Sequence, residues 1–193
     1  MKKYMTVLLI LICASCSMPE TKIYSLALKS QVAPAKIRTG AAIDVVVRSP
    51  QYLAQPYIGV RTSPYQLEIS RYSKWDSSPA EIVREAFRES VSRTQMFREV
   101  RASLAVPGDF YALEINLRKF ERLDSGEESF AELAFDVRLL SPEGGEMYRD
   151  SFSKSIPLDR RNFLRLAEAL SAGLSEELGK VQSALAGAFP ETP

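Results

Sequence analysis

Two cysteines near the start of the chain, Cys13 and Cys16, are the residues whose chemistry the sequence defines best. A thiol can form a disulfide, bind a metal or accept an acyl group, and its neighbours decide which. The chain contains no histidine, so Ser–His–Asp and Cys–His catalytic arrangements and the usual zinc sites cannot be built. Carboxylate pairs, lysine bases and Ser–Lys dyads remain available, but no spacing singles one out. An enzyme is therefore disfavoured, and no cofactor or metal is expected.

The residues before these cysteines have the order of a secretory signal peptide. Lys2 and Lys3 are followed by an apolar run over residues 5–12 and then by the small residues Ala14 and Ser15. The run is shorter than the roughly 20 apolar residues that a membrane-spanning helix needs. We therefore expect residues 1–15 to be removed as a signal peptide, the alternative being a buried N-terminal helix.

The sequence Ala14-Ser15-Cys16 resembles the end of the bacterial lipobox, in which the signal is cut before a cysteine that is then acylated. The resemblance implies a mature chain that begins at Cys16 and carries fatty acids such as palmitate. Cys13 stands where the lipobox usually has Leu, which leaves cleavage without lipidation open. Once Cys13 is removed, no second thiol remains for a disulfide. Several acyl chains would make the anchor durable, because each buried CH₂ contributes about 0.8 kcal/mol.

The charge of the mature chain argues against polyanionic partners. Removing Lys2 and Lys3 changes the formal net charge from +1 to −1, because residues 1–15 contain no acidic residue. A near-neutral chain with interspersed charges lacks the electrostatic footprint of a nucleic-acid-binding protein. It also lacks a polybasic patch for anionic lipid. We therefore expect no nucleic-acid partner, and a membrane attachment that depends on the lipid anchor.

The hydrophobic pattern of the remaining chain changes between strand and helix periods. Ser78-Pro79-Ala80-Glu81 is a capping box with proline in the first helical position, and it predicts a helix that begins after Ser78. A second helix is predicted from about residue 160 to residue 186, with Asp159 as its N-cap. Strands are predicted over residues 23–28, 42–48, 57–61, 66–71, 109–121 and 129–140, with a further strand through Tyr148, Phe152 and Ile156.

These elements predict an α+β fold in which a single, mostly antiparallel sheet carries two amphipathic helices on one face. The opposite face should be solvated. Its predicted side chains are Glu114, Asn116, Arg118, Glu132, Asp136 and Arg138. Residues 16–22 are expected to form a lipidated tether, residues 23–187 a single domain, and residues 188–193 a flexible tail. In the hairpin of residues 57–71, we expect Ile58 and Val60 to share a face with Leu67 and Ile69.

Six short sequence blocks, spread through the mature chain, occur in the same order as in one known protein family. They are Tyr24-Ser25-Leu26, Pro50-Gln51-Tyr52-Leu53-Ala54-Gln55-Pro56, Tyr72-Ser73-Lys74-Trp75-Asp76, Ser78-Pro79-Ala80-Glu81, Asp109-Phe110-Tyr111-Ala112-Leu113 and Phe120-Glu121. Together they resemble the ABC-type transport auxiliary lipoproteins, a family that includes the PqiC-like proteins. The resemblance implies an envelope complex in which an ABC transporter and a membrane-anchored MCE-domain protein move lipids between membranes. It implies no catalytic residue, and only lipidated Cys16 is carried over.

Six residues are candidate contacts for a partner or for lipid: Tyr52, Leu53, Tyr57, Trp75, Phe120 and Phe130. The first three lie in or beside a proline-bounded loop and Trp75 precedes the helix cap, where burial inside the domain is the alternative. Phe120 and Phe130 fall on the predicted polar face and would be cross-strand neighbours in a hairpin that turns about Ser125. Cover by another segment of the chain is their alternative. Substituting both with Ser is expected to weaken assembly more than folding.

The sequence thus favours a lipid-anchored accessory subunit of an envelope ABC/MCE-type lipid-transport complex, which acts by docking or by completing a conduit. The alternative is a structural or assembly lipoprotein of another envelope machine, such as a secretion or outer-membrane assembly system. The domain is expected to face the periplasm. Ser17 stands where enteric lipoproteins retained at the inner membrane have Asp, which favours the outer membrane. A homo-oligomer is left open.

Overall fold

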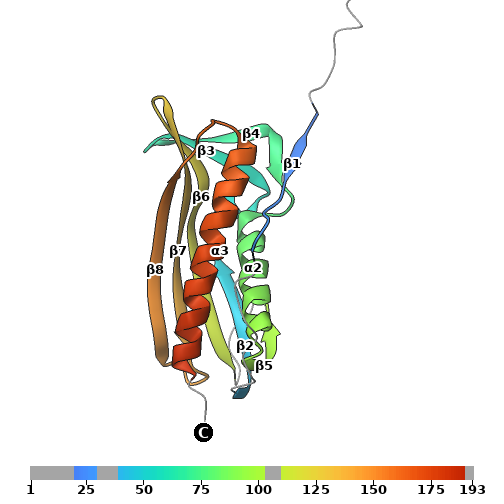
Figure 1. The fold of residues 1–193 in the computed structure, drawn as a ribbon, viewed down its shortest axis with the longest axis vertical. Coiled ribbons are helices and arrows are strands. Elements are labelled where there is room, and N and C mark those ends of the chain that lie inside the picture. Colours follow the sequence, from blue (N-terminus) through green and yellow to red (C-terminus); the bar gives the residue numbers. More distant parts are fainter. Residues whose placement is uncertain (1–19, 30–38, 103–109, 190–193) are drawn as a thin grey trace, which may run out of the picture.

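The computed structural model describes residues 20–29, 39–102 and 110–189, and within them the chain forms eight strands, two α-helices and one 3₁₀ helix (Figure 1). The strands are β1 (Lys22–Tyr24), β2 (Thr39–Arg48), β3 (Tyr57–Ser63), β4 (Gln66–Trp75), β5 (Phe97–Arg101), β6 (Tyr111–Ser125), β7 (Glu128–Leu140) and β8 (Glu146–Pro157). The helices are η1 (Gln51–Ala54), α2 (Pro79–Thr94) and α3 (Phe163–Ala188). The predicted α+β fold with a mostly antiparallel sheet is confirmed. The predicted signal peptide and Cys16 lie outside the described residues.

The long strand β6 is the centre of the sheet. On one edge it pairs with β7 along nearly its whole length, and β7 pairs with β8, which forms the predicted antiparallel meander. On the other edge its first half pairs with β2 and its second half with β3, both in parallel. β4 and β1 extend the sheet beyond β3, and β5 extends it beyond β2. The sheet is therefore branched, with β6 and β7 running through both parts.

Both α-helices cover the same face of the sheet, which we call the inner face; the opposite one is the outer face (Figure 1). The apolar core lies between the sheet and the helices. It includes Val45 of β2, Phe87 of α2, Phe135 of β7 and Leu174 of α3, all of them buried. Phe87 meets Phe135 edge to face, with ring centroids 5.6 Å apart. The amphipathic stripes predicted for the helices thus face the sheet.

Each of the two α-helices begins with a side-chain cap. The Oγ of Ser78 accepts a hydrogen bond from the backbone N–H of Glu81 at 3.2 Å, as the capping box predicts. Helix α3 begins later than predicted, at Phe163, because Asn162 rather than Asp159 caps it. The Oδ1 of Asn162 accepts from the backbone N–H of Arg165 at 2.9 Å. Asp159 lies before the helix and forms an ion pair with the side chain of Arg165.

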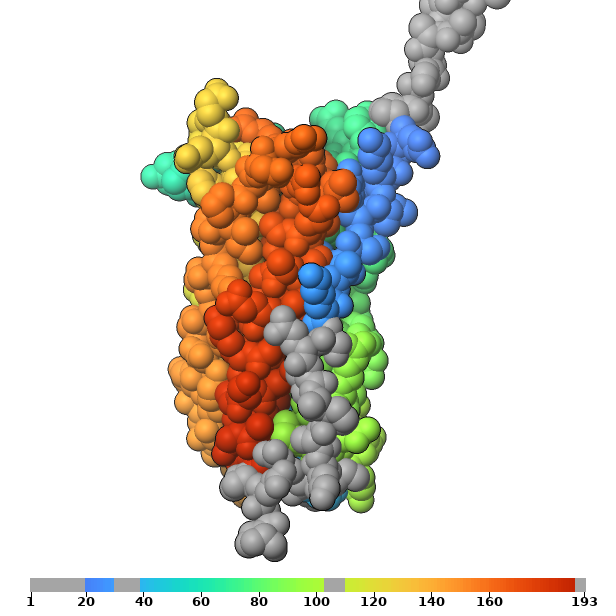
Figure 2. Space-filling view, in the orientation of Figure 1, coloured from blue at the N-terminus to red at the C-terminus, as the bar shows by residue number. Residues whose placement is uncertain are grey.

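The first predicted strand is shorter than expected. β1 ends at Tyr24, and residues 25–29 continue as an extended segment along α3 (Figure 2). The backbone N–H groups of Ala27 and Lys29 donate to the hydroxyls of Ser171 and Ser175, each at 3.1 Å. Helix hydroxyls therefore take the place of a partner strand. The alternation of apolar residues continues here although the segment is not hydrogen-bonded to a neighbouring strand. This segment joins the start of the described chain to the helical layer.

A β-bulge in β6 overturns the prediction that Phe120 and Phe130 are neighbours on the polar face. The register changes between Leu117 and Lys119, so that Phe120 pairs with Leu133 and Phe130 pairs with Leu123. One extra residue on a strand moves the following side chains to the opposite faces. Phe120 therefore points into the core, whereas Phe130 stays on the outer face.

The β3–β4 hairpin also differs by one position from the predicted register. Ile69 pairs with Gly59 and Leu67 pairs with Arg61, so Leu67 and Ile69 do not share a face with Ile58 and Val60. Ile58 and Val60 are buried on the inner face, whereas Ile69 is 42% exposed. The shift places two large apolar side chains on the outer face.

Candidate docking surface

The proline-bounded loop is fastened to the outer face by Tyr52. Its hydroxyl donates to Oε2 of Glu121 at 2.9 Å, and Nε of Arg61 donates to Oε1 of the same carboxylate at 2.5 Å. Burial, followed by the negative charge of Glu121, raises the pKa of the Tyr52 phenol well above its ordinary value. The neighbouring Leu53 points into the core and is 1% exposed. The loop is thus fixed to the sheet at both residues.

A second buried carboxylate lies beside this cluster. Glu132 is the cross-strand partner of Glu121, and its Oε2 lies 2.8 Å from Nζ of Lys119. Paired carboxylates are one of the arrangements that could support acid–base chemistry without histidine. Here each carboxylate has its own cation, Arg61 for Glu121 and Lys119 for Glu132. The arrangement suits the fastening of a loop, since a buried charge needs a hydrogen-bonded counter-charge to be tolerated.

Trp75 and Phe120 come together in the core. Their ring centroids lie 5.3 Å apart in an edge-to-face arrangement, and the two side chains are 2% and 1% exposed. Nε1 of Trp75 has no hydrogen-bond partner among the described residues. Tyr52, Leu53, Trp75 and Phe120 therefore make their main contacts within the domain. They are four of the six predicted contact residues.

Tyr57 and Phe130 remain on the outer face, together with residues that sequence reasoning did not select. Tyr57 pairs with Lys74, which pairs with Ile23, in one row across β3, β4 and β1. A second row crosses five strands and consists of Leu67, Arg61, Leu123, Phe130 and Pro157. Tyr65, in the β3–β4 turn, is 98% exposed. We call Ile23, Tyr57, Tyr65, Leu67, Ile69, Leu123 and Phe130 the apolar half of the outer face.

The rest of the outer face is ionic. It surrounds a shallow hollow of about 600 Å³ that is lined by Arg48, Glu114, Ile115, Asn116, Asp136, Arg138, Arg149, Asp150 and Ser151. We call this surface the ionic half. Arg138 and Arg48 pair with Glu114, and Arg118 pairs with Asp136 at 3.1 Å. The side chains predicted for the polar face from Glu114 to Arg118 and from Asp136 to Arg138 are thus confirmed on it.

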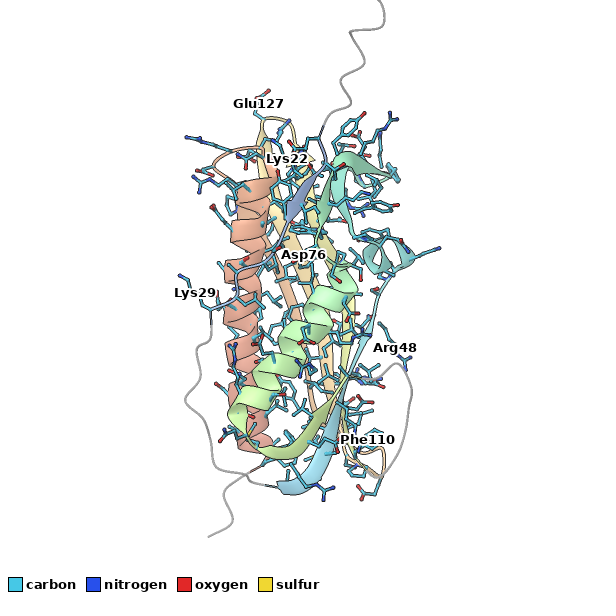
Figure 3. The ribbon with its side chains drawn as sticks, turned by 90° about the vertical axis from the view of Figure 1, so that its right-hand side faces the viewer. Lys22, Lys29, Arg48, Asp76, Phe110 and Glu127 are labelled. Carbon is cyan, nitrogen blue, oxygen red and sulfur yellow. The ribbon has the colours of Figure 1, made fainter. Side chains whose placement is uncertain are left out.

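The two halves lie at opposite ends of the sheet. Figure 3 places Lys22, at the start of β1, and Glu127, in the β6–β7 turn, at one end, which we call the hairpin end. Phe110, just before β6, lies at the other end, and Arg48 lies between the two (Figure 3). The apolar half belongs to the hairpin end, because one of its rows crosses β6 and β7 beside their turn and the other ends on β1, next to Lys22.

No helix in residues 20–29, 39–102 or 110–189 is both long and apolar enough to cross a membrane. Across the same part of the chain, no group of three or more acidic or thiol side chains is placed to hold a metal ion.

Comparison with known proteins identifies the family. The sequence model for the ABC-type transport auxiliary lipoprotein component matches residues 24–181, which is more than half of the chain. The chain therefore belongs to this family of auxiliary lipoproteins, as its sequence blocks predict. This is not a known enzyme family, and its lipoprotein character fits a membrane-anchored location in the envelope. No curated protein matches the chain.

Two solved structures share the fold of this chain. The structure of protein XCC0632 from Xanthomonas campestris is 19% identical with a TM-score of 0.72, covering 86% of this chain and 96% of the other. An uncharacterised protein is 16% identical with a TM-score of 0.66, covering 86% of this chain and 99% of the other. At these identities the likeness establishes the fold alone.

Proposed function

We propose that this chain is a lipid-anchored accessory subunit of an envelope ABC/MCE-type lipid-transport complex, and that it acts by docking and without catalysis. The observation that carries the proposal is the family match over residues 24–181. Acylation of Cys16 would tether the domain to the membrane, with the outer membrane favoured by Ser17. The MCE-domain protein and the ABC transporter components are the proposed partners.

Docking is favoured over passage of lipid through the single domain. The layer between the sheet and the helices is filled by the apolar core, whose large side chains include the fully buried Phe87, Phe120 and Phe135. The ionic half, by contrast, is open to solvent and slightly hollow. Several of its charges pair with one another, as Arg138 does with Glu114 and Arg118 with Asp136, so a partner with complementary charges would meet side chains that are already arranged on the surface.

Of the six predicted contact residues, Tyr57 and Phe130 are the two in the apolar half of the outer face. Tyr57 is 38% exposed and Phe130 is partly exposed. Tyr52, Leu53, Trp75 and Phe120 would act indirectly, by holding the strands and the loop that shape this face. A partner that covers the outer face would therefore bind over them and not to them.

The anchor and the partner can be tested in the native membrane. The wild-type protein is expected to begin at Cys16, to carry acyl mass and to remain with membranes, whereas the Cys16→Ala variant should lose both properties. Crosslinking in intact cells, followed by mass spectrometry, should capture an MCE-domain protein with the wild-type chain. Repeated capture of a secretion or outer-membrane assembly protein in its place would favour the alternative function.

A further inference from the structure

We propose that the apolar half of the outer face rests against the surface of the bilayer that holds the lipid anchor. The inference depends on the acylation of Cys16 in the proposed function and goes beyond it, because it assigns a second membrane contact to the folded domain. It divides the outer face into an end that meets lipid and an end left free for protein.

The exposed apolar side chains of the described residues are unevenly distributed. Seven large ones are exposed: Ile23, Tyr57, Tyr65, Ile69, Tyr72, Met147 and Leu164. The first five belong to β1, β3, β4 or the turn between β3 and β4, and all of them except Tyr72 are part of the apolar half. Leu67, Leu123 and Phe130 extend this surface as partly exposed neighbours. A concentration of exposed apolar side chains on one surface marks an interaction site.

The position of this surface along the chain indicates which partner it meets. Only six peptide units separate Cys16 from Lys22, the first residue of β1. At most they span about 20 Å. The 15 residues of β6 extend over roughly 50 Å. An anchor at Cys16 therefore holds the hairpin end near the bilayer, while the ionic half can stand away from it.

The residue types also suit a bilayer surface. Tyrosine is enriched where membranes meet water, because its ring is apolar and its hydroxyl remains hydrated. Tyr65 projects from a turn, and Lys74 lies over the ring of Tyr57, with Nζ 5.8 Å from the ring centroid. Lys22, Arg71 and Lys74 are three cations that could approach phosphate groups, and Glu68 and Glu127 are acidic residues at the same end. Three cations fall short of a polybasic patch, so ring and aliphatic contacts would contribute most.

A weak contact is sufficient at this place. Once the acyl chains are inserted, the hairpin end meets the bilayer at the high effective concentration that a short tether imposes. Binding of the apolar half then needs no affinity of its own for free vesicles. It would restrict the orientation of the domain and direct the ionic half away from the membrane.

The test uses the lipidated full-length mature protein in vesicles of phosphatidylethanolamine and phosphatidylglycerol in a ratio of roughly 3:1. The phosphatidylglycerol gives this probe membrane an anionic component. Tyr65→Cys and Ile69→Cys are labelled with an environment-sensitive fluorophore, and Met147→Cys is the matched control. Met147 is also exposed and apolar but lies in β8 beside the β7–β8 turn, at the other end. The acylated Cys16 does not react with the label.

The probes at positions 65 and 69 are expected to shift to shorter emission wavelengths and to lose fluorescence when the vesicles contain a spin-labelled lipid. The probe at position 147 should show neither change. Flotation of all three proteins with equal emission and equal quenching would overturn the membrane contact while leaving the anchor intact. Failure of the proteins to float with the vesicles would overturn the anchor, and this inference with it. Thermal unfolding of each labelled protein checks that Ile69→Cys retains the fold.

Discussion

The two halves of the outer face share the strands β6 and β7, yet they present opposite chemistry to the solvent. In the ionic half, neighbouring strands place Arg138 beside Glu114 and Arg118 beside Asp136, so these four charges are paired within the face. In the apolar half, the neighbouring strands contribute Leu67, Leu123 and Phe130 to one row. A surface that satisfies its own charges can stay in water, whereas rows of exposed apolar side chains favour contact with another phase or molecule.

The boundary between the two halves coincides with the β-bulge of β6. Beyond the bulge, Phe120 packs inward and Glu121 lies under the loop of Tyr52. At this level β3 replaces β2 as the neighbour of β6, and η1 lies in the chain between these two strands. The bulge, the change of strand partner and the buried carboxylate therefore lie at one level of the sheet, where the two surfaces meet.

The largest expected effect separates two phenylalanines that the sequence alone treats as equivalent. Phe120→Ser should destabilise the protein by about 3–5 kcal/mol, as for other large-to-small changes in a packed core. Phe130→Ser, on the apolar half, should cost about 1 kcal/mol or less, since its side chain already meets solvent. Urea denaturation of the purified domain measures both. Equal losses would contradict the assignment of the two rings to different faces.

A smaller effect is expected where the two halves meet. Glu121→Ala leaves Arg61 and Tyr52 without their shared acceptor in a buried site. It should lower the free energy of unfolding by about 2 kcal/mol. This is less than for a fully buried pair, because Arg61 keeps partial access to water. Glu114→Ala in the ionic half is the matched control and should cost about 1 kcal/mol or less. Thermal and urea unfolding would give both values. A larger loss of stability for Glu114→Ala than for Glu121→Ala would contradict the structural role assigned to Glu121.

The hydroxyl of Tyr52, at the same junction, should contribute about 1 kcal/mol to the free energy of unfolding, and this contribution should depend on pH. The pKa of Tyr52 is raised in the folded protein, so its contribution is complete below the ordinary tyrosine pKa of about 10 and is lost as the pH rises toward the folded value. Tyr52→Phe should therefore be less stable than wild type at neutral pH, and this difference should shrink in strong alkali. Burial also raises the pKa of Tyr148 to about 12, but that group is present in both proteins. A stability difference that stays constant from neutral to alkaline pH would show that the hydroxyl contributes little.

Much of this arrangement follows from sequence patterns, and the exceptions share a physical cause. The cap at Ser78, the meander from β6 to β8 and the ionic side chains of the outer face follow from local periodicity and capping chemistry. The faces of Phe120, Leu67 and Ile69 depend on strand register, which a single bulge or turn shifts by one residue. The Tyr52–Glu121–Arg61 contacts join positions far apart in the chain. Their only local sign was a tyrosine in a proline-bounded loop, whose hydroxyl needs a partner when buried.

The smallest effect on stability, and the sharpest test of the ionic half as a docking surface, is expected for Arg138→Ala. Its ion pair with Glu114 lies at a partly exposed site, so the change should cost about 0.5 kcal/mol or less. If a partner binds here, crosslinking to the MCE-domain protein should nevertheless fall clearly, because the guanidinium borders the hollow. Arg93→Ala on α2 removes a comparable exposed pair, with Glu89, on the helix-covered side, and should leave crosslinking unchanged. Equal crosslinking by both variants would mean that the ionic half is only a solvated surface.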